Sequence, residues 1–143
     1  MDFARIIEFT GNHPFLILAF VGTLAALIYS EISRRLSGMQ TVGAVEATQL
    51  SNRENAIFLD IREDREYKGG HIPEAIHIPL SQLSDRVSEL DKYKKCPVIA
   101  YCRSGNRSNS AGGVLKKNGF EKVYNLGGGI VSWEKASLPV STK

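Results

Sequence analysis

Residues 97–108 read Pro97-Val-Ile-Ala-Tyr101-Cys102-Arg-Ser-Gly-Asn-Arg-Ser108, and they give the clearest indication of the fold. Residues 97–101 form a short apolar run typical of a buried strand, and residues 107–118 have a helical pattern that Gly119 ends. A strand that passes through a short loop into a helix is the repeating unit of a parallel α/β sheet, and such loops gather backbone N–H groups. The stretch therefore predicts both an α/β fold and an anion-binding site around Cys102.

Three further apolar runs and two further helical patterns alternate along the chain. The expected strands cover residues 56–61, 76–78 and 122–126, and the expected helices cover residues 45–53 and 81–90. Short buried strands separated by helices predict an α/β layer with a mainly parallel sheet. About 100 residues remain from Gln40 onward, which is enough for a single domain with a modest core.

The position of Cys102 predicts a reactive thiol. A loop that enters a helix aims several N–H groups at one point, and the helix dipole adds positive potential there. Gly105 permits the sharp turn, and Arg103 and Arg107 add two positive charges. Such surroundings lower the pKa of a cysteine from about 8.5 to about 3.5–7.5. Cys102 is therefore the candidate nucleophile, and the alternative is an inert cysteine buried in a turn.

Cys96 is the other cysteine of the chain, and a disulfide between it and Cys102 is not expected. Six extended residues separate the two by about 20 Å, whereas bridged Cα atoms lie about 4.4–6.8 Å apart. Two unpaired thiols fit a reducing compartment.

The composition excludes several functional classes. Of 143 residues, 43% are hydrophobic and 23% are charged, as in an ordinary globular domain. A net charge of +3 without a run of like charges gives no indication of nucleic-acid binding. Two Cys and three scattered His lack metal-site spacing. Gly127–Gly129 lacks the G-x-G-x-x-G pattern of dinucleotide binding and is interpreted as a turn before a helix. We therefore expect no metal, no cofactor and no nucleic-acid partner.

The N-terminal part differs sharply from the rest. Between Glu8 and Glu31, 22 residues carry no charged side chain, and as a helix they span about 33 Å, against about 30 Å for the hydrocarbon core of a bilayer. We predict a short segment over residues 1–13, a transmembrane helix over residues 14–30, a juxtamembrane linker over residues 31–40 and the folded domain over residues 41–143. The alternatives are a buried core helix and a cleaved signal peptide, and the acidic start of the chain disfavours the latter.

Charges beside this helix predict its orientation. Arg34 and Arg35 follow the helix, whereas Arg5 is the only Lys or Arg before it. The positive-inside rule then places the folded domain in the cytoplasm. Gly22 and Ala26 form one small-x-x-x-small pair, which by itself is a weak signal for pairing of two helices.

From about Thr41 to Pro139, the chain resembles a rhodanese-like domain. The matching landmarks, in the order and near the spacing of that family, are Leu59-Asp60-Ile61-Arg62, Glu66-Tyr67, Gly70-His71-Ile72-Pro73-Glu74-Ala75, Cys102–Ser108, Leu126-Gly-Gly-Gly-Ile130 and Trp133. With the apolar segment in front, the whole chain is similar to the small membrane-anchored rhodanese-like proteins of bacteria. Glu74 departs from the pattern, because the family commonly has Gly there, and this departure is expected to affect only a turn.

The resemblance implies a five-stranded parallel sheet flanked by helices and a sulfurtransferase activity. Cys102 would accept a sulfane sulfur as a covalent persulfide, so no separate cofactor is implied. The substrate-binding residues implied by the resemblance are the loop residues Arg103, Ser104, Gly105, Asn106 and Arg107. Asp60 and Arg62 would brace that loop.

The implied partners are a small sulfur donor such as thiosulfate and a thiol or protein acceptor. The apolar helix adds the lipid bilayer and other membrane proteins as candidate partners. The implied location is the inner (plasma) membrane of a bacterium, in a single pass.

Two other functions fit the same residues. Dual-specificity phosphatases share this fold but resemble Cys-x5-Arg, whereas Cys102 and Arg107 form Cys-x4-Arg, a shorter loop that favours sulfur over phosphate. The other function is a membrane-tethered binding module with little or no turnover. His71 and His77 are interpreted as structural residues, and Trp133 as a packing residue.

Overall fold

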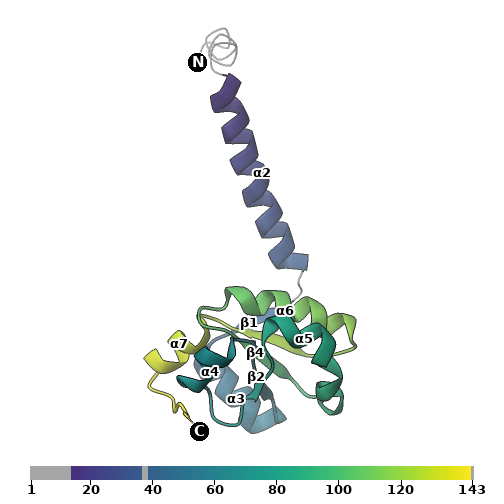
Figure 1. The fold of residues 1–143 in the computed structure, drawn as a ribbon, viewed down its shortest axis with the longest axis vertical. Helices are drawn as coiled ribbons and strands as arrows, with labels where there is room; N and C mark the ends of the chain where they lie inside the picture. Colours follow the sequence, from purple (N-terminus) through teal and green to yellow (C-terminus); the bar gives the residue numbers. More distant parts are fainter. Residues whose placement is uncertain (1–13, 37–38, 143) are drawn as a thin grey trace. The chain divides into compact units, whose positions relative to one another are not determined.

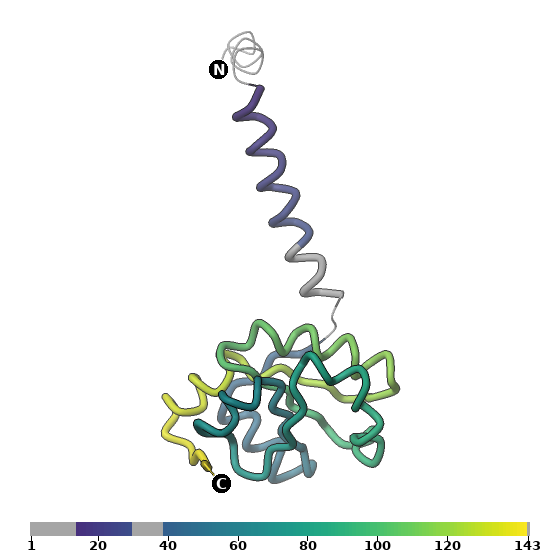
Figure 2. Tube along the Cα trace, viewed as in Figure 1, coloured from purple at the N-terminus to yellow at the C-terminus, as the bar shows by residue number. Residues whose placement is uncertain are grey.

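The structure, a computed structural model, describes residues 14–36 and 39–142 (Figure 1, Figure 2). The chain divides into two units, Met1–Leu36 and Ser37–Lys143. The described part of the first unit is helix α2 (Pro14–Leu36). The elements of the second unit are β1 (Gln40–Val42), α3 (Ala44–Glu54), β2 (Ile57–Asp60), α4 (Asp64–Lys68), β3 (Ile76–His77), α5 (Leu80–Arg86), the 3-10 helix η1 (Val87–Tyr93), β4 (Val98–Tyr101), α6 (Asn106–Lys117), β5 (Val123–Leu126) and α7 (Gly129–Lys135).

The five strands form one parallel sheet in the order β1-β5-β4-β2-β3. This arrangement confirms the predicted five-stranded α/β domain. Strand β4 lies at the centre, where Ile99 pairs with Phe58 of β2 on one side and with Tyr124 of β5 on the other. Strand β1 was not located by the sequence patterns, because its three residues are too few to show a hydrophobic period.

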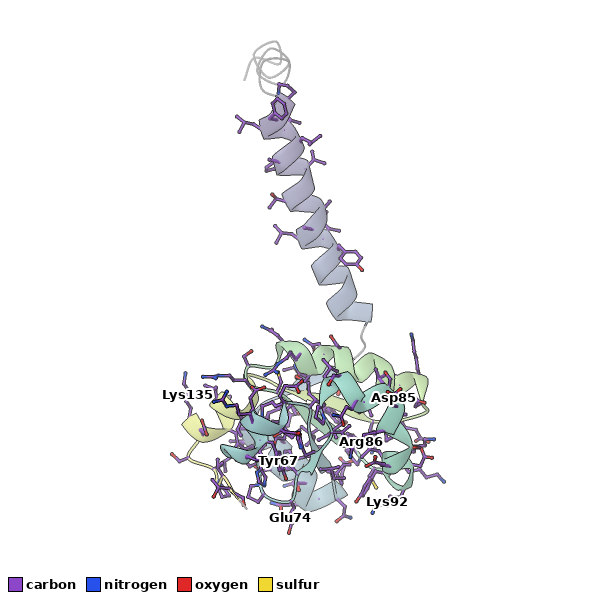
Figure 3. The ribbon with its side chains drawn as sticks, viewed as in Figure 1. Tyr67, Glu74, Asp85, Arg86, Lys92 and Lys135 are labelled. Carbon is purple, nitrogen blue, oxygen red and sulfur yellow. The ribbon has the colours of Figure 1, made fainter. Side chains whose placement is uncertain are left out.

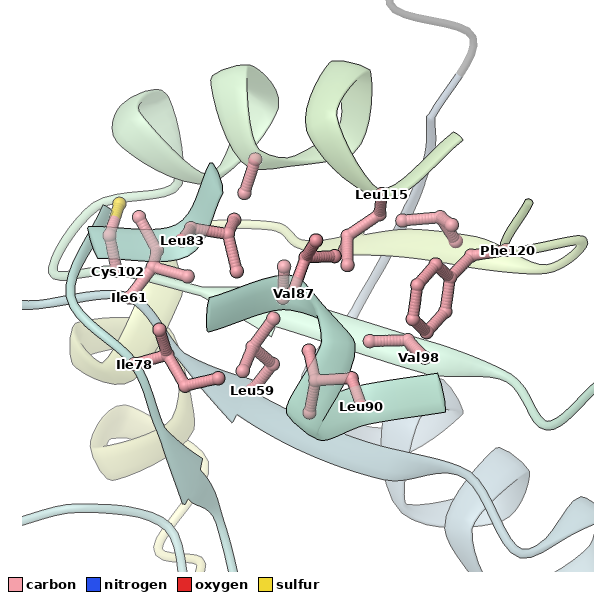
Figure 4. Close-up of a cluster of buried hydrophobic side chains, with 13 residues drawn as sticks. Leu59, Ile61, Ile78, Leu83, Val87, Leu90, Val98, Cys102, Leu115 and Phe120 are labelled. Atoms are coloured by element: carbon pink, nitrogen blue, oxygen red, sulfur yellow. The ribbon is translucent and has the colours of Figure 1, made fainter. Parts of the chain in front are cut away.

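Alternation along β4 divides the core between the two faces of the sheet. Val98, Ala100 and Cys102 lie in a hydrophobic cluster with residues of α5, η1 and α6, which Figure 4 shows. Ile99 and Tyr101 lie in the opposite cluster with residues of α3 and α7. Successive side chains of a strand point to opposite faces, so the same period that builds the core places Cys102 on the side of α6.

Trp133 closes the second cluster near the carboxyl terminus. Its indole contacts the ring of Phe58 edge to face, with centroids 5.2 Å apart and planes at 72°. The indole Nε1–H donates a 2.8 Å hydrogen bond to the carbonyl of Pro139. Trp133 is thus a packing residue, as predicted, and it ties the last residues of the domain to the sheet.

The transmembrane helix predicted over residues 14–30 is not supported. Within the residues that the structure describes, no helix combines the length and the apolar character that a membrane span requires. Helix α2 has 23 residues, but Glu31, Arg34 and Arg35 fall in its last two turns. The uncharged part before Glu31 covers about 25 Å, which is shorter than the hydrocarbon core of about 30 Å. The helix also continues to Leu36, beyond the predicted start of the linker.

Candidate active site

Cys102 directly follows the central strand β4, and helix α6 begins four residues later at Asn106. Gly105 makes this short connection possible, because it has a left-handed backbone with φ +93°. A side chain at this position would come within 3.2 Å of the carbonyl oxygen of Leu126 and 3.3 Å of the nitrogen of Gly128. The turn brings the N–H of Gly105 back to the sulfur of Cys102, at 3.1 Å.

Hydrogen bonds to the Cys102 sulfur favour its thiolate. Burial alone would raise the pKa of the thiol, because Cys102 is 1% exposed and a buried charge is poorly solvated. The N–H and the hydroxyl of Ser108 act in the opposite direction, as do the N–H groups of Ser104 and Gly105. Together these donors lower the pKa of the Cys102 thiol below its ordinary value. The predicted reactive thiol therefore has a structural basis in the loop.

Ser108 is a site residue whose role the sequence patterns did not indicate. Its Oγ lies 3.7 Å from the sulfur of Cys102, 3.0 Å from the carbonyl of Gly105 and 2.5 Å from Oδ1 of Asn125. One hydroxyl proton can serve only one of these acceptors at a time. Asn125 lies on β5, so the signal that could have found this contact is a polar residue in a strand that is otherwise apolar.

Substitution Ser108→Ala is expected to raise the pH at which Cys102 becomes reactive. The variant loses the hydroxyl donor but keeps the backbone N–H, so the shift is partial. We expect alkylation by iodoacetamide at pH 7 to slow by about three-fold, because the thiolate fraction falls. The measurement is the rate of Cys102 alkylation against pH, with Ser110→Ala on the exposed side of α6 as the control. An unchanged pH profile for Ser108→Ala would contradict the assigned role.

The first turn of α7 supports the Cys102 loop through backbone contacts. The N–H of Ile130 donates a 2.9 Å hydrogen bond to the carbonyl of Cys102, and the N–H of Val131 donates a 3.3 Å bond to the carbonyl of Arg103. Gly129 has φ +58°, and a Cβ there would overlap the backbone of Cys102 and Arg103. The sequence predicted only a turn before a helix over Gly127–Gly129, because nothing local shows which loop the glycines approach.

The two arginines of the loop have different surroundings. Arg107 forms a two-pronged ion pair with Glu66 of α4, at 2.9 Å and 2.7 Å. This carboxylate raises the pKa of Arg107 and accepts hydrogen bonds from both terminal nitrogens of its guanidinium. Arg103 is exposed and forms no ion pair among the residues that the structure describes. Arg103 is thus the loop cation available to an anionic ligand. Ser104 and Asn106, which lie beside Arg103 and Arg107 at the outer edge of the Cys102 loop, are also exposed.

Asp60 and Arg62 form a buried ion pair at the end of β2. The carboxylate of Asp60 accepts bonds from Nε and Nη2 of Arg62, the latter at 2.6 Å, and also from the Arg62 backbone N–H at 3.0 Å. Arg62 also donates to the carbonyl of Gly70 and lies over the ring of Tyr101, 5.6 Å from its centroid. The contacts therefore hold the turn at Gly70 and Tyr101, which is the residue directly before Cys102.

Three stacked rings fix the turn that follows α4. Tyr67 lies between His71 and His77, with ring centroids 3.9 Å and 4.2 Å apart (Figure 3 labels Tyr67). His71 Nδ1 lies 3.2 Å from the Tyr67 carbonyl, and His77 Nε2 lies 2.8 Å from the Arg62 carbonyl. Both histidines are packed and hydrogen-bonded, in agreement with their predicted structural role.

Glu74 occupies a left-handed turn position, with φ +62°. Glycine adopts this conformation at little cost, which explains why a glycine is expected there. No group of three or more His, Cys, Asp or Glu within the described residues is arranged to hold a metal ion.

A pocket of about 250 Å³ lies beside the Cys102 loop, between α4 and α7. Its lining residues are Arg62, Arg65, Glu66, Gly69, Gly70, Arg103, Ile130, Val131 and Glu134. Figure 1 shows α4 and α7 as neighbours at this end of the domain. Because the carboxyl ends of parallel strands form the usual ligand-binding edge of an α/β sheet, this pocket lies where a substrate is expected.

Comparisons with known proteins agree with this geometry. A family model described as a rhodanese-like domain matches residues 43–136, which extend from α3 to α7. The uncharacterized protein YibN of Escherichia coli (strain K12) is 32% identical over 137 residues, which cover 95% of this chain and 96% of YibN. A sulfurtransferase of Allochromatium vinosum is 37% identical over 103 residues and covers 69% of this chain and 94% of its own length.

Among solved structures, a rhodanese-related protein from Thermoplasma volcanium is similar, with a TM-score of 0.65 and 28% sequence identity. The superposition covers 73% of this chain and 99% of that protein. The structural similarity therefore lies in the folded domain.

Proposed function

This chain belongs to the rhodanese-like domain family, and from that premise we propose that it is a sulfurtransferase that carries a sulfane sulfur on Cys102. The observation that carries the proposal is the environment of the sulfur. A thiol of lowered pKa lies under a loop whose N–H groups converge on it, with the N–H of Gly105 at 3.1 Å. A persulfide formed there is also an anion, so the donors that favour the thiolate would favour the loaded state too.

The proposed reaction has two transfers. With thiosulfate as donor, the Cys102 thiolate attacks the outer sulfur, a new S–S bond forms, and the old S–S bond breaks with its electron pair leaving on sulfite. An acceptor thiolate then attacks the outer sulfur of the persulfide, and the electron pair of that S–S bond returns to Cys102 as the thiolate. Arg103 is exposed at the rim and would hold the departing anion.

The test is the mass of the intact chain after treatment with thiosulfate. We expect the full-length protein, held in detergent, to gain the mass of one sulfur atom and to lose it again on addition of a thiol acceptor. Cys102→Ala should gain nothing, whereas Cys96→Ala, the matched control, should load normally, because Cys96 lies at the other end of β4. A mass gain on Cys96 alone, or none with several donors, would rule out the proposal.

The binding-module alternative has its own outcome in this experiment. A chain that loads Cys102 stoichiometrically but does not pass the sulfur to any thiol acceptor would act as a module rather than as a transferase. The Allochromatium vinosum protein, named a sulfurtransferase, supports turnover as the expected outcome.

We also propose that α2 attaches the domain to a membrane, with the domain on the cytoplasmic side. The helix carries exposed large apolar side chains such as Phe15, Leu18 and Phe20, and Figure 3 draws side chains projecting from α2 on different sides. Exposed apolar surface of this kind is typical of membrane or partner contact. The side assignment rests on Arg34 and Arg35, which follow the apolar run and favour the anionic lipids of the cytoplasmic leaflet.

Vesicle flotation tests this attachment. We expect the full chain to float with vesicles of phosphatidylethanolamine and phosphatidylglycerol, and a chain that begins at Met39 to stay in solution. Flotation should persist in high salt, because the contact is apolar and is not screened. A full chain that stays with the soluble fraction would contradict the attachment.

A further inference from the structure

The pocket between α4 and α7 holds charges that the domain itself does not neutralise. Arg62 is paired with Asp60, and Glu66 with Arg107. The remaining charged groups of the lining are Arg65, Arg103 and Glu134, all exposed and none in an ion pair among the described residues. The pocket thus presents two cations and one carboxylate that are available to a ligand.

The pocket is joined to the nucleophile through the backbone. Arg103 is the residue after Cys102 and lines the pocket. Ile130 and Val131 line it as well, and their N–H groups bond the carbonyls of Cys102 and Arg103. A ligand held in the pocket is therefore held beside the Cys102 loop.

The burial of the nucleophile limits what can enter the loop. Cys102 is 1% exposed, so only the small outer sulfur of a donor can reach its thiolate, and the rest of the donor has to lie outside the loop. The pocket of about 250 Å³ is the space available there. A sulfite group has the volume of about two water molecules, about 60 Å³, and would leave most of the pocket unfilled.

We propose that this pocket binds the organic part of a low-molecular-weight persulfide that carries both a carboxylate and an ammonium group. Arg65, together with Arg103, contacts the carboxylate, and Glu134 contacts the ammonium. This inference rests on the sulfur transfer proposed above and names the class of donor. A donor with two charges of opposite sign matches all three available groups, whereas thiosulfate matches only the arginines.

The transfer from such a donor balances without an oxidant or reductant. The Cys102 thiolate attacks the outer sulfur of R–S–SH, a bond forms between the two sulfurs, and the S–S bond of the donor breaks. Its electron pair leaves on the inner sulfur as R–S⁻, which takes the proton of the new persulfide and departs as R–SH. The loaded enzyme is then a persulfide anion under the N–H groups of the loop.

Three persulfides and two variants test the assignment of charges. Cysteine persulfide carries both groups, cysteamine persulfide lacks the carboxylate, and N-acetylcysteine persulfide lacks the ammonium. The variants are Arg65→Gln and Glu134→Gln of the full-length protein. The matched controls are Lys68→Gln, which removes an exposed cation of the same helix, and Glu46→Gln on α3. The measurement is the second-order rate constant for loading of Cys102, followed by intact mass.

We expect each variant to slow only those donors that carry the charged group it contacts. Arg65→Gln slows loading by cysteine persulfide and N-acetylcysteine persulfide about ten-fold and leaves cysteamine persulfide within two-fold. Glu134→Gln slows loading by cysteine persulfide and cysteamine persulfide about ten-fold and leaves N-acetylcysteine persulfide within two-fold. The two control variants change no rate by more than two-fold. An effect of Arg65 or Glu134 can then be assigned to a contact with the donor and not to the change in the net charge of the protein.

The outcomes distinguish this inference from the function on which it rests. If all variants load from every persulfide at the wild-type rate, the pocket does not select the donor and the inference is overturned, while the sulfurtransferase proposal stands. If each variant slows all three persulfides equally, the residues act on folding or on Cys102, and the assignment of charges is also overturned. If neither thiosulfate nor any persulfide loads Cys102, the sulfurtransferase proposal itself fails.

Discussion

Gly129→Ala is expected to lower the free energy of unfolding by about 3 kcal/mol and to abolish most sulfur loading. A left-handed backbone costs an alanine about 1–2 kcal/mol, and forcing an added methyl into closely packed atoms costs about 1–3 kcal/mol more. The atoms in the way are the backbone carbonyls of Cys102 and Arg103, so relief requires the nucleophile loop to move. Stability and activity should therefore fall together.

Urea unfolding of the full chain in detergent measures the first effect, and the thiosulfate mass gain measures the second. Gly113→Ala is the matched control, because a Cβ at this position of α6 meets nothing within 4 Å. In a helix interior that control should be neutral or stabilising by about 0.5–1 kcal/mol. A Gly129→Ala protein as stable as wild type would show that α7 does not fix the loop as described.

Asp60→Asn is expected to lower the free energy of unfolding by about 3–5 kcal/mol. The substitution leaves the guanidinium of Arg62, which is 5% exposed, without its counter-ion, and removal of one partner of a buried pair has a cost of this size. Sulfur loading should also fall, because the pair positions Tyr101, the residue before the nucleophile. Thermal unfolding and the mass assay give the two readouts.

Asp64→Asn is the control for this substitution, since it removes the same group from an exposed position four residues later. Its expected effect is below about 0.5 kcal/mol. The double variant Asp60→Asn with Arg62→Met should recover part of the lost stability, because it removes the uncompensated buried charge. A double variant less stable than Asp60→Asn alone would contradict the assigned cause.

The parts of the fold that the sequence predicted are those with a local signal. The runs at 97–101 and 122–126 are apolar because both faces of the central strands are buried, and Gly119 follows α6, which ends at Lys117. Helix α4 was not predicted, because five residues are too short to show a 3.6-residue period. Helix α7 was expected only as a helix after the turn at Gly127–Gly129, without bounds, because its seven residues are also too short to show that period. Strand β1, which has three residues, was not predicted for the same reason.

In the candidate site, too, the features that could be predicted are those with a local sequence signal. Cys102 and its loop lie in one continuous segment, so their chemistry could be predicted from order and spacing. The contacts that position the loop join residues far apart in the chain, such as Ser108 with Asn125 and Arg107 with Glu66. Arg107 was expected as a free cation beside Cys102, and the structure adds an ion pair with Glu66 to its interaction with Cys102.

The two edges of the sheet have a consequence for contacts between copies of this domain. The two edge strands, β1 and β3, contain three and two residues, so each edge exposes only a few backbone groups that could pair with another molecule. Very short edges are one way in which natural sheets resist edge-to-edge aggregation. The longer strands β2, β4 and β5 are all internal. The short edges therefore leave little backbone through which the sheets of two copies of this domain could pair.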